Sequence, residues 1–293
     1  MTTADAVGVD IAGRRGRVRN NSRGNAVLRQ AVLVAVVVGA LAPGYLMITG
    51  ALKTQEQFLE QPWALPNPAS LNGFKAAWGD QLPIWFANTL IVTTLSALGV
   101  TVLSALAAWG FAHWPFRGRE TWLGLVVSLM VVPPVVLLIP LFQFAAKLDW
   151  ISTFRIVILV YIGLMLPFSI YLLANFFRSI PPSLTEAAQI DGASSWLIFR
   201  RIVIPLSGPP LATRAVVNVL CAWIELLLAL VLLQDDSKKT LMVGITGFQS
   251  RYSLDIPTVL AGMTLVTLPL VVAYLFFQRY FIAGLTAGST KGE

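Results

Sequence analysis

Charged residues are scarce in this chain of 293 residues. Lys, Arg, Asp and Glu together make up 12% of it, while 56% of its residues are hydrophobic. Ordinary soluble domains carry about 25% charged residues. This shortage argues against a soluble domain as the main body of the protein and predicts that lipid is its principal solvent.

Cysteine and histidine are almost absent, with Cys221 and His113 as the single examples. One cysteine cannot form a disulfide framework or a cysteine-based metal site. A phosphate loop of the form G-x-x-x-x-G-K-[ST] is also missing, because "GLTAGSTKG" at 284–292 has similar letters with the wrong spacing. The sequence therefore predicts no metal or cofactor bound by this chain, no ATP site and no enzymatic activity of its own.

Long uncharged runs are what the sequence has in abundance. A helix needs about 20 apolar residues to cross the roughly 30 Å of a bilayer core. Prolines inside several runs predict kinks, which neighbouring helices tolerate in a membrane bundle. The sequence thus predicts an all-α integral membrane protein with six transmembrane helices, at Ala31–Ala51, Leu82–Ala112, Thr121–Ala146, Ile156–Phe177, Ile256–Gln278 and, interrupted by Glu225, Ala215–Gln234.

Lys and Arg are distributed unequally between alternate connections. The N-terminal tail, the loops on its side and the C-terminal tail carry 14 basic and six acidic residues, with Arg214 counted at a helix start, whereas the opposite loops carry seven of each. Basic residues concentrate on the cytoplasmic side. We therefore expect both termini in the cytoplasm, with an Arg-rich tail at 1–29, a membrane domain at 30–283 and a C-terminal tail at 284–293.

The Arg-rich tail has two other interpretations. Nucleic-acid binding is disfavoured because the tail lacks interleaved aromatic residues and leads directly into a span, so attraction to anionic membrane lipid is preferred. A secretory signal is suggested by Ala40-Leu41-Ala42, but the apolar run continues past Pro43 to Ala51. That length favours an uncleaved span.

The stretch "SLTEAAQIDGASSWLIFRRIVIPL" at 183–206 interrupts the apolar pattern. Ser183 and Glu186 have the spacing of a capping box, which predicts the start of a short helix that ends at Gly192. Ser194 or Ser195 can cap a second helix, which we expect Pro205 to end. Helical spacing predicts one face with Leu184, Ala187, Ala188 and Asp191, and an apolar stripe with Trp196, Phe199, Ile202 and Val203. Two such helices form a knob that needs a groove, in its own bundle or on a partner.

The same stretch resembles the "EAA" loop of ABC importer membrane subunits. Its spacing is matched by Glu186-Ala187-Ala188, by Gly192 after three intervening residues, and by Ile202 and Pro205 after nine further intervening residues. Only Ile204 replaces the usual Leu. Other segments are similar to the carbohydrate branch of that family, which serves maltose, multiple sugars and glycerol phosphate. They are "LKTQEQF" at 52–58, "NTLIVTTLSAL" at 88–98, "VPPVVLLIPLF" at 132–142, "GFQSRYSLD" at 247–255 and "FFQRYFIAGLTAGSTKG" at 276–292.

The resemblance implies a type I ABC importer permease in a bacterial inner membrane. Its partners would be a second homologous permease, a dimer of ATPases that holds the ATP and Mg²⁺, an external substrate-binding protein and a sugar. The loop at about 179–207 would then couple the permease to the ATPase through Glu186, Ala187, Ala188, Asp191, Gly192, Trp196, Phe199 and Pro205. Helix capping remains an alternative for Glu186, and lipid-interface anchoring remains one for Trp196 and Phe199.

Glu225 is the one acidic residue inside a predicted span. A lone carboxylate at that depth costs about 2.5–3.5 kcal/mol, so we expect it to face a cavity or a polar partner. It would line a sugar path or bond within a subunit interface; alternatively, it would carry protons in a secondary transporter. Asn88, Asn218 and Trp223 are further candidates for the path. In relatives the fifth span often reads Trp-Asn-Glu-Phe where this chain has Trp223-Ile224-Glu225-Leu226.

Overall fold

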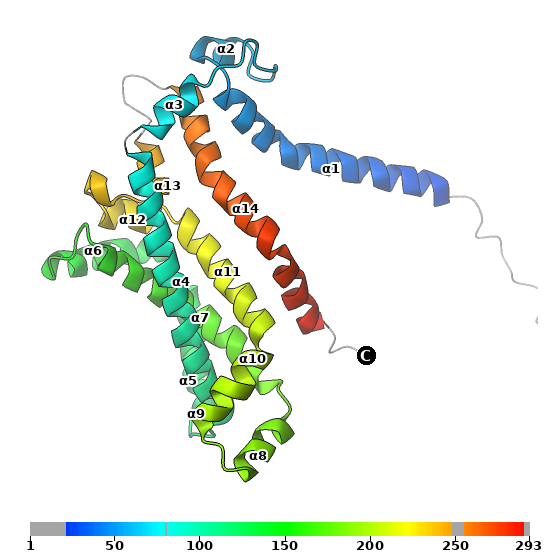
Figure 1. Ribbon diagram of the computed structural model, residues 1–293, viewed down its shortest axis with the longest axis vertical. Helices are drawn as coiled ribbons and strands as arrows, with labels where there is room; N and C mark the ends of the chain where they lie inside the picture. Colours follow the sequence, from blue (N-terminus) through cyan, green and yellow to red (C-terminus); the bar gives the residue numbers. More distant parts are fainter. Residues whose placement is uncertain (1–21, 80, 248–254, 290–293) are drawn as a thin grey trace, which may run out of the picture. The chain divides into compact units, whose positions relative to one another are not determined.

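The computed structural model describes residues 22–79, 81–247 and 255–289, with side chains described at 26–79, 81–247, 255–276 and 278 (Figure 1). Within those ranges the regular secondary structure is entirely helical, which confirms the predicted all-α class. Residues 1–46 and 47–293 form separate units. The first contains most of α1 (Ser22–Ala51), a helix that includes the predicted first span; most of the predicted Arg-rich tail lies outside the described residues.

Four helical segments are long and apolar enough to cross a membrane by themselves. They are Ala26–Ala51 of α1, α4 (Leu82–His113), α7 (Phe154–Arg178) and Ile256–Phe276 of α14 (Ile256–Ser289). Each contains one of the predicted spans or most of it. Short helices connect them at one end of the second unit: α2 (Gln55–Glu60), α3 (Asn72–Trp78), η4 (Asp236–Lys238) and α13 (Leu241–Thr246).

The span predicted at Thr121–Ala146 is not one straight helix. It is formed by α5 (Arg119–Ser128), η1 (Leu129–Val131), η2 (Pro134–Leu137) and α6 (Leu138–Lys147), and its two halves meet at 87°. Pro133 and Pro134 explain the bend, because the residue before a proline is pushed out of the helical region and proline donates no backbone hydrogen bond. The apolar run was predicted correctly, and its sharp break was not.

The prediction of a single span at Ala215–Gln234 is wrong. α11 (Gly208–Ile224) ends at Glu225, whose backbone is extended (φ −67°, ψ 126°), and the short α12 (Leu227–Leu232) follows. The second bent pair is instead formed by residues 195–206 with α11, which meet at 77°. If each bent pair is one span, the described residues hold six.

The centre of the second unit is a bundle in which α4 lies along both α7 and α11 (Figure 1). Gly99 permits the close approach of α4 to α7, because a Cβ atom there would lie 2.5 Å from Cδ1 of Ile162. Val92, Val157 and Tyr161 are almost fully buried in the core that these helices share. The bundle therefore provides rigid elements to which the polar 183–206 stretch is attached at one end.

Candidate functional site

The 183–206 stretch folds as four short helical segments, together called the coupling module (residues 182–206). They are α8 (Pro182–Ile190), α9 (Ser195–Ile198), the π-helical turn η3 (Phe199–Val203) and α10 (Ile204–Leu206). Figure 1 shows α8 and α9 at the end of the bundle where α4 and α7 terminate. Two short helices were thus predicted correctly, although the second continues through a π turn.

The ends of these helices differ in part from the predictions. α8 begins at Pro182 with no side-chain cap, so the predicted capping box of Ser183 and Glu186 is wrong. The reason is that proline at the first helical position already has the helical φ angle and lacks the N–H that a cap would satisfy. Ser194 does cap α9, since its Oγ accepts a hydrogen bond from Leu197 N at 3.3 Å. Pro205 lies inside α10, so it does not end the second helix.

Gly192 ends α8 as predicted, in the left-handed region with φ +80°. An added Cβ there would meet no atom within 4 Å, so the only obstacle to a side chain is backbone strain. We expect Gly192→Ala to lower the free energy of unfolding by about 1–2 kcal/mol, the cost of a left-handed conformation for an L-residue. The midpoint of thermal unfolding measures this loss.

Gly208→Ala is the matched control for that prediction. Gly208 also has open space around its Cα, but it lies in α11 with an ordinary helical backbone. Alanine there is expected to leave the midpoint unchanged or to raise it. Equal midpoints for the two variants would show that alanine at position 192 causes no measurable backbone strain.

One face of the coupling module is attached to its own bundle. Ile198, Phe199 and Val203 are buried, at 1%, 5% and 0% exposure. They pack with Trp109 of α4 and Phe177 of α7, and the rings of Phe177 and Phe199 meet edge to face at 6.5 Å. Phe199 therefore occupies a groove within this chain and is not exposed for a partner.

The opposite face is exposed and largely apolar. Ile190 is 87% exposed and Trp196 is 59% exposed, so more than half of each residue's surface is uncovered within the described chain. Ala188 is half-buried and packs against the cluster that contains Trp109, Phe177 and Phe199. The sequence analysis missed Ile190, although its spacing of three from Ala187 places both on one side of α8. The residues assigned to this face are Leu184, Glu186, Ala187, Ile190, Asp191, Gly192 and Trp196. The other exposed residues of the module are Pro182, Ser183, Gln189, Ser194, Leu197, Arg200, Arg201, Pro205 and Leu206.

An ion pair closes the bundle beside the coupling module. Arg178, at the end of α7, contacts Glu120 of α5 with Nη2 to Oε1 at 2.9 Å and also donates to the carbonyl of Phe111 of α4 at 3.2 Å. Three helix ends are thereby joined by one side chain.

The four residues predicted for the transport path do not form one cluster. Asn88 donates to the carbonyls of Ser237 and Lys239, both at 2.9 Å, and so holds the loop around η4. In that loop, hydrogen bonds from the backbone N–H and the hydroxyl of Ser237 lower the pKa of the Asp235 carboxyl. Trp223 is buried edge to face against Phe86 at 5.7 Å. These contacts give Asn88 and Trp223 packing roles near one end of the bundle.

Glu225 finds its polar partners within this chain. Its Oε2 accepts from the Tyr161 hydroxyl at 2.6 Å and from Ala229 N at 3.1 Å, and its Oε1 accepts from Leu228 N at 2.8 Å. The carboxylate thus satisfies backbone donors in the first turn of α12, which would otherwise be unpaired inside the membrane. Through its hydrogen bond with Tyr161, Glu225 also connects α7 to the chain between α11 and α12.

Arg214 was counted among the cytoplasmic basic residues as the start of a helix, but it lies deeper in the bundle than that. It is six residues inside α11, about 9 Å from the first residue at 1.5 Å per residue. The residue is 6% exposed, and its Nε donates to Ser169 Oγ of α7 at 2.7 Å. One turn further along α11, Asn218 is fully buried, and neither of its amide atoms has a hydrogen-bond partner within the described chain.

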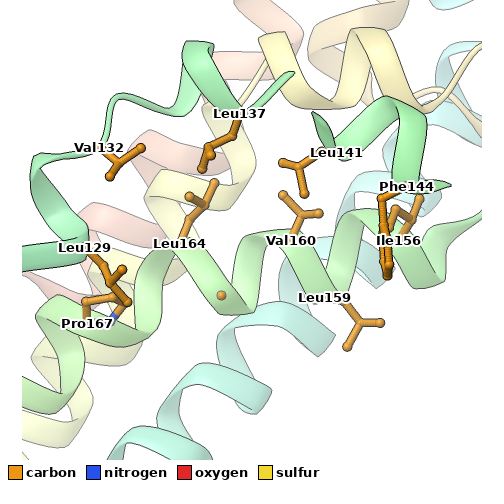
Figure 2. A pocket seen from close by; sticks show the side chains of 11 residues that line it. Leu129, Val132, Leu137, Leu141, Phe144, Ile156, Leu159, Val160, Leu164 and Pro167 are labelled. Carbon is orange, nitrogen blue, oxygen red and sulfur yellow. The ribbon is translucent and has the colours of Figure 1, made fainter. Parts of the chain in front are cut away.

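An apolar groove lies between the bent segment and α7. It has a volume of about 420 Å³. Figure 2 shows Leu141 of α6 opposite Val160 of α7 across it. Sugar sites need hydrogen-bonding groups, so this lining is unsuited to a sugar. The lining residues are Leu129, Val132, Leu137, Leu141, Phe144, Ile156, Leu159, Val160, Gly163, Leu164 and Pro167.

Comparison with known proteins identifies the family. Residues 100–286, which include the coupling module, match the family described as binding-protein-dependent transport system inner membrane component. The chain belongs to this family. It is a multi-pass membrane permease, and the predicted importer class is confirmed. Membership in this family also excludes the alternative of a proton-coupled secondary transporter, in agreement with the hydrogen bonds that Glu225 makes inside the chain.

Relatives of this permease have names that refer to carbohydrates. It is 34% identical to the melibiose/raffinose/stachyose import permease protein of Bacillus subtilis, over 89% of this chain and 95% of that protein. It is 33% identical to a trehalose/maltose transport system permease protein of Thermococcus litoralis, over 90% of this chain and 95% of that one. Among solved structures, a chain of a bacterial ABC transporter that imports the acidic polysaccharide alginate superposes with a TM-score of 0.80. At 21% identity, with 90% of this chain and 98% of that chain covered, this likeness shows that the fold is the same.

Proposed function

We propose that this permease moves a sugar or sugar derivative, delivered by an external substrate-binding protein, across a bacterial inner membrane. ATP hydrolysis, with its Mg²⁺, takes place on a separate pair of ATPase subunits, and a second homologous permease completes the pathway. The carbohydrate names of the relatives support the substrate class. A related alginate transporter structure includes a periplasmic protein bound to an alginate pentasaccharide, which supports the delivery step.

The observation that carries this proposal is the exposed apolar face of the coupling module. The short helices α8 and α9 present Ile190 and Trp196 on the outside of the module, and a groove on an ATPase subunit would provide a complementary surface for them. In this arrangement Leu184, Ala187, Ile190 and Trp196 make the contact, with Glu186 and Asp191 at its polar margin. Phe199 positions the module against the bundle, Pro205 lies exposed in α10, and Gly192 sets the turn between α8 and α9.

The module also sets the proposed orientation. If the ATPases bind at residues 182–206, that end of the bundle is cytoplasmic. Each span carries the chain to the other side of the membrane. The tail at 1–29 and the tail at 284–293 are separated by six spans, so they lie on the same side, and the loops reached after an odd number of spans lie on the opposite side. Both tails are then cytoplasmic, which agrees with the excess of Lys and Arg on that side.

Reconstitution of the assembled transporter tests the proposal. The chain is purified with its co-expressed neighbours, placed in vesicles, and supplied with the co-purified binding protein and its bound sugar. We expect an ATPase subunit in the purified assembly and uptake that requires ATP hydrolysis but continues when an ionophore removes the proton gradient. Uptake that persists without ATP and depends on a proton gradient would contradict the proposal.

A further inference from the structure

A polar pocket lies in and beside α2, at the end of the second unit opposite to α8 (Figure 1). It has a volume of about 260 Å³. In the proposed orientation this part of the chain follows the first span and therefore faces the outside of the cell. Apart from Lys53, the lining residues are exposed or half-buried, so the pocket is open to water on that side. It is called the loop pocket, and it is lined by Lys53, Gln57, Glu60, Gln61, Ala64, Leu65, Pro66 and Asn67.

Hydrogen bonds hold the loop pocket in shape. Gln57 of α2 donates through Nε2 to the carbonyl of Asn67 at 3.0 Å, and its Oε1 accepts from Thr54 N at 3.1 Å. Beyond the pocket, Ser70 N donates to the carbonyl of Leu52 at 2.7 Å. These bonds close the loop after α2 back onto that helix. The pocket is thus formed without a ligand, as binding sites for small molecules usually are.

Lys53 places a buried positive charge at the loop pocket. The residue is 2% exposed, and its Nζ donates to the backbone carbonyls of Gln61 and Pro62, both at 2.8 Å. An ammonium group has three N–H donors, so one of them has no partner within the described chain. None of the three ion pairs found within the described residues includes Lys53. Because a buried charge is costly unless it is fully bonded, an acceptor on a ligand in the pocket would stabilise it.

The remaining polar side chains indicate what kind of ligand fits. The side chains of Glu60, Gln61 and Asn67 line the pocket and make no hydrogen bond or ion pair among the described residues. A carboxylate only accepts, an ammonium only donates, and an amide does both. An anion would be attracted by Lys53 and repelled by Glu60. Neutral hydroxyl groups satisfy both, because each can accept from the ammonium or donate to the carboxylate.

We propose that the loop pocket binds one unit of a neutral sugar on the outer face of the permease, with one hydroxyl on Lys53 and another on Glu60. The amides of Gln61 and Asn67 supply further donors and acceptors, and Leu65 offers apolar surface to the C–H groups of the sugar. The volume lies just below the roughly 300–1,000 Å³ of pockets for drug-sized ligands, which suits a single sugar unit.

The loop pocket would act before the sugar enters the membrane, since all of its lining residues lie between the first two spans. The inference rests on the proposed function, which supplies both the outward orientation of this loop and the substrate class. It adds a second place at which the transporter contacts its sugar, separate from any site within the bundle.

A cysteine at the edge of the loop pocket provides a site-specific assay. Leu65 lines the pocket and is 71% exposed, so Leu65→Cys disturbs little packing. Cys221→Ser removes the single natural cysteine of the chain. The assembled transporter is placed in lipid nanodiscs without ATP or binding protein and treated with N-ethylmaleimide, and mass spectrometry follows the alkylation rate at position 65.

Glucose, maltose, trehalose and raffinose are the neutral probes, and glucuronate is the anionic comparison. At least one neutral probe should slow alkylation at position 65 in a saturable manner, about threefold at twice its dissociation constant. Glucuronate should not. Leu59→Cys is the matched control position, since Leu59 is 64% exposed on α2 and does not line the pocket. Its alkylation rate should be unchanged by every probe.

Variants assign the protection to the polar lining. Glu60→Ala should raise the sugar concentration for half-protection about tenfold, the loss expected for a hydrogen bond to a charged group. Gln61→Ala should raise it less. Glu56→Ala is the control, because it removes the same charge from an exposed position of α2 that does not line the pocket. The contrast between positions 65 and 59 tests the inference even if a variant fails to fold.

Several results would overturn the inference. These are no protection by any of the four neutral sugars, equal protection at positions 59 and 65, equal protection by glucuronate, or unchanged half-protection in Glu60→Ala. Protection by the ligand-free binding protein and by no free sugar would make the loop pocket a protein contact instead. ATP-dependent uptake is measured with the same transporter in vesicles. Intact uptake without protection would reject the loop-pocket site alone, whereas uptake that does not require ATP would reject the proposed function.

Discussion

Ile190→Glu is expected to abolish ATP-driven uptake while the permease still folds and inserts. The Ile190 side chain is 87% exposed in this chain, so its replacement disturbs no internal packing. In the docked state the new carboxylate would be buried without a partner, at a cost of about 2–5 kcal/mol. A cost of about 2 kcal/mol corresponds to a loss of roughly 30-fold in ATPase binding, and uptake in vesicles should fall accordingly.

The neighbouring Gln189 supplies the control for this prediction. Gln189→Glu adds the same charge to an exposed position of α8, one residue away and turned by about 100° around the helix. We expect it to retain uptake, and Ile190→Leu should do so as well. Normal uptake and normal ATPase binding by Ile190→Glu would show that the apolar face of α8 is not the docking surface.

Ala188, although it belongs to the EAA pattern, is a less informative position for this test than Ile190. Because it is half-buried and packs against the bundle, a charge there would disturb the attachment of α8 as well as any docking. Loss of uptake in Ala188→Asp would therefore not separate folding from coupling. The exposed Ile190 separates them.

Glu225→Ala is expected to destabilise the permease strongly. It leaves the Tyr161 hydroxyl and the N–H groups of Leu228 and Ala229 without their partner, and each unpaired buried group costs about 1–3 kcal/mol. We expect a loss of about 3 kcal/mol or more in the free energy of unfolding. Unfolding in SDS, followed by tryptophan fluorescence, measures that loss.

Tyr161→Phe should destabilise the permease less than Glu225→Ala, because it removes a single hydrogen bond and leaves the cap of α12 in place. It should cost about 1 kcal/mol. Glu225→Gln keeps one acceptor oxygen and should fall between the two. If Glu225→Ala were as stable as the wild type but inactive in uptake, Glu225 would act directly on the substrate rather than by holding α12.

The coupling module shows which of its features could be predicted from local sequence patterns. The turn at Gly192 and the cap at Ser194 depend on a few neighbouring residues, so both were predictable. The start of α8 was predicted wrongly, because Ser183 and Glu186 match a capping box while Pro182 initiates the helix one residue earlier. The assignment of Phe199 to a docking surface failed for a different reason: helical periodicity identifies an apolar stripe without saying which surface it packs against.

The membrane spans show the same limit. Hydropathy detected the apolar character of 121–146, but the 87° bend depends on the neighbouring helices that accommodate Pro133-Pro134. Likewise, the broken fifth segment depends on Tyr161, 64 residues earlier in the chain, whose hydroxyl bonds the carboxylate at the break. The spacing of Arg214, Asn218, Cys221 and Glu225 was visible in the sequence. Hydropathy alone, however, predicts a membrane span there and does not indicate that these four residues share one side of a helix.

By itself the sequence determined that this protein is an all-helical membrane protein whose 183–206 loop resembles that of a permease family, because hydropathy, glycine turns and the EAA spacing are local properties of the chain. The tertiary structure decided which side chains are free to act. It buried Phe199 in its own bundle, left Ile190 exposed and engaged Glu225 with Tyr161. It also placed Arg214 one turn from Asn218, whose amide has no hydrogen-bond partner among the described residues. Burial and hydrogen-bond pairing depend on contacts between segments far apart in the chain, and no local pattern specifies them.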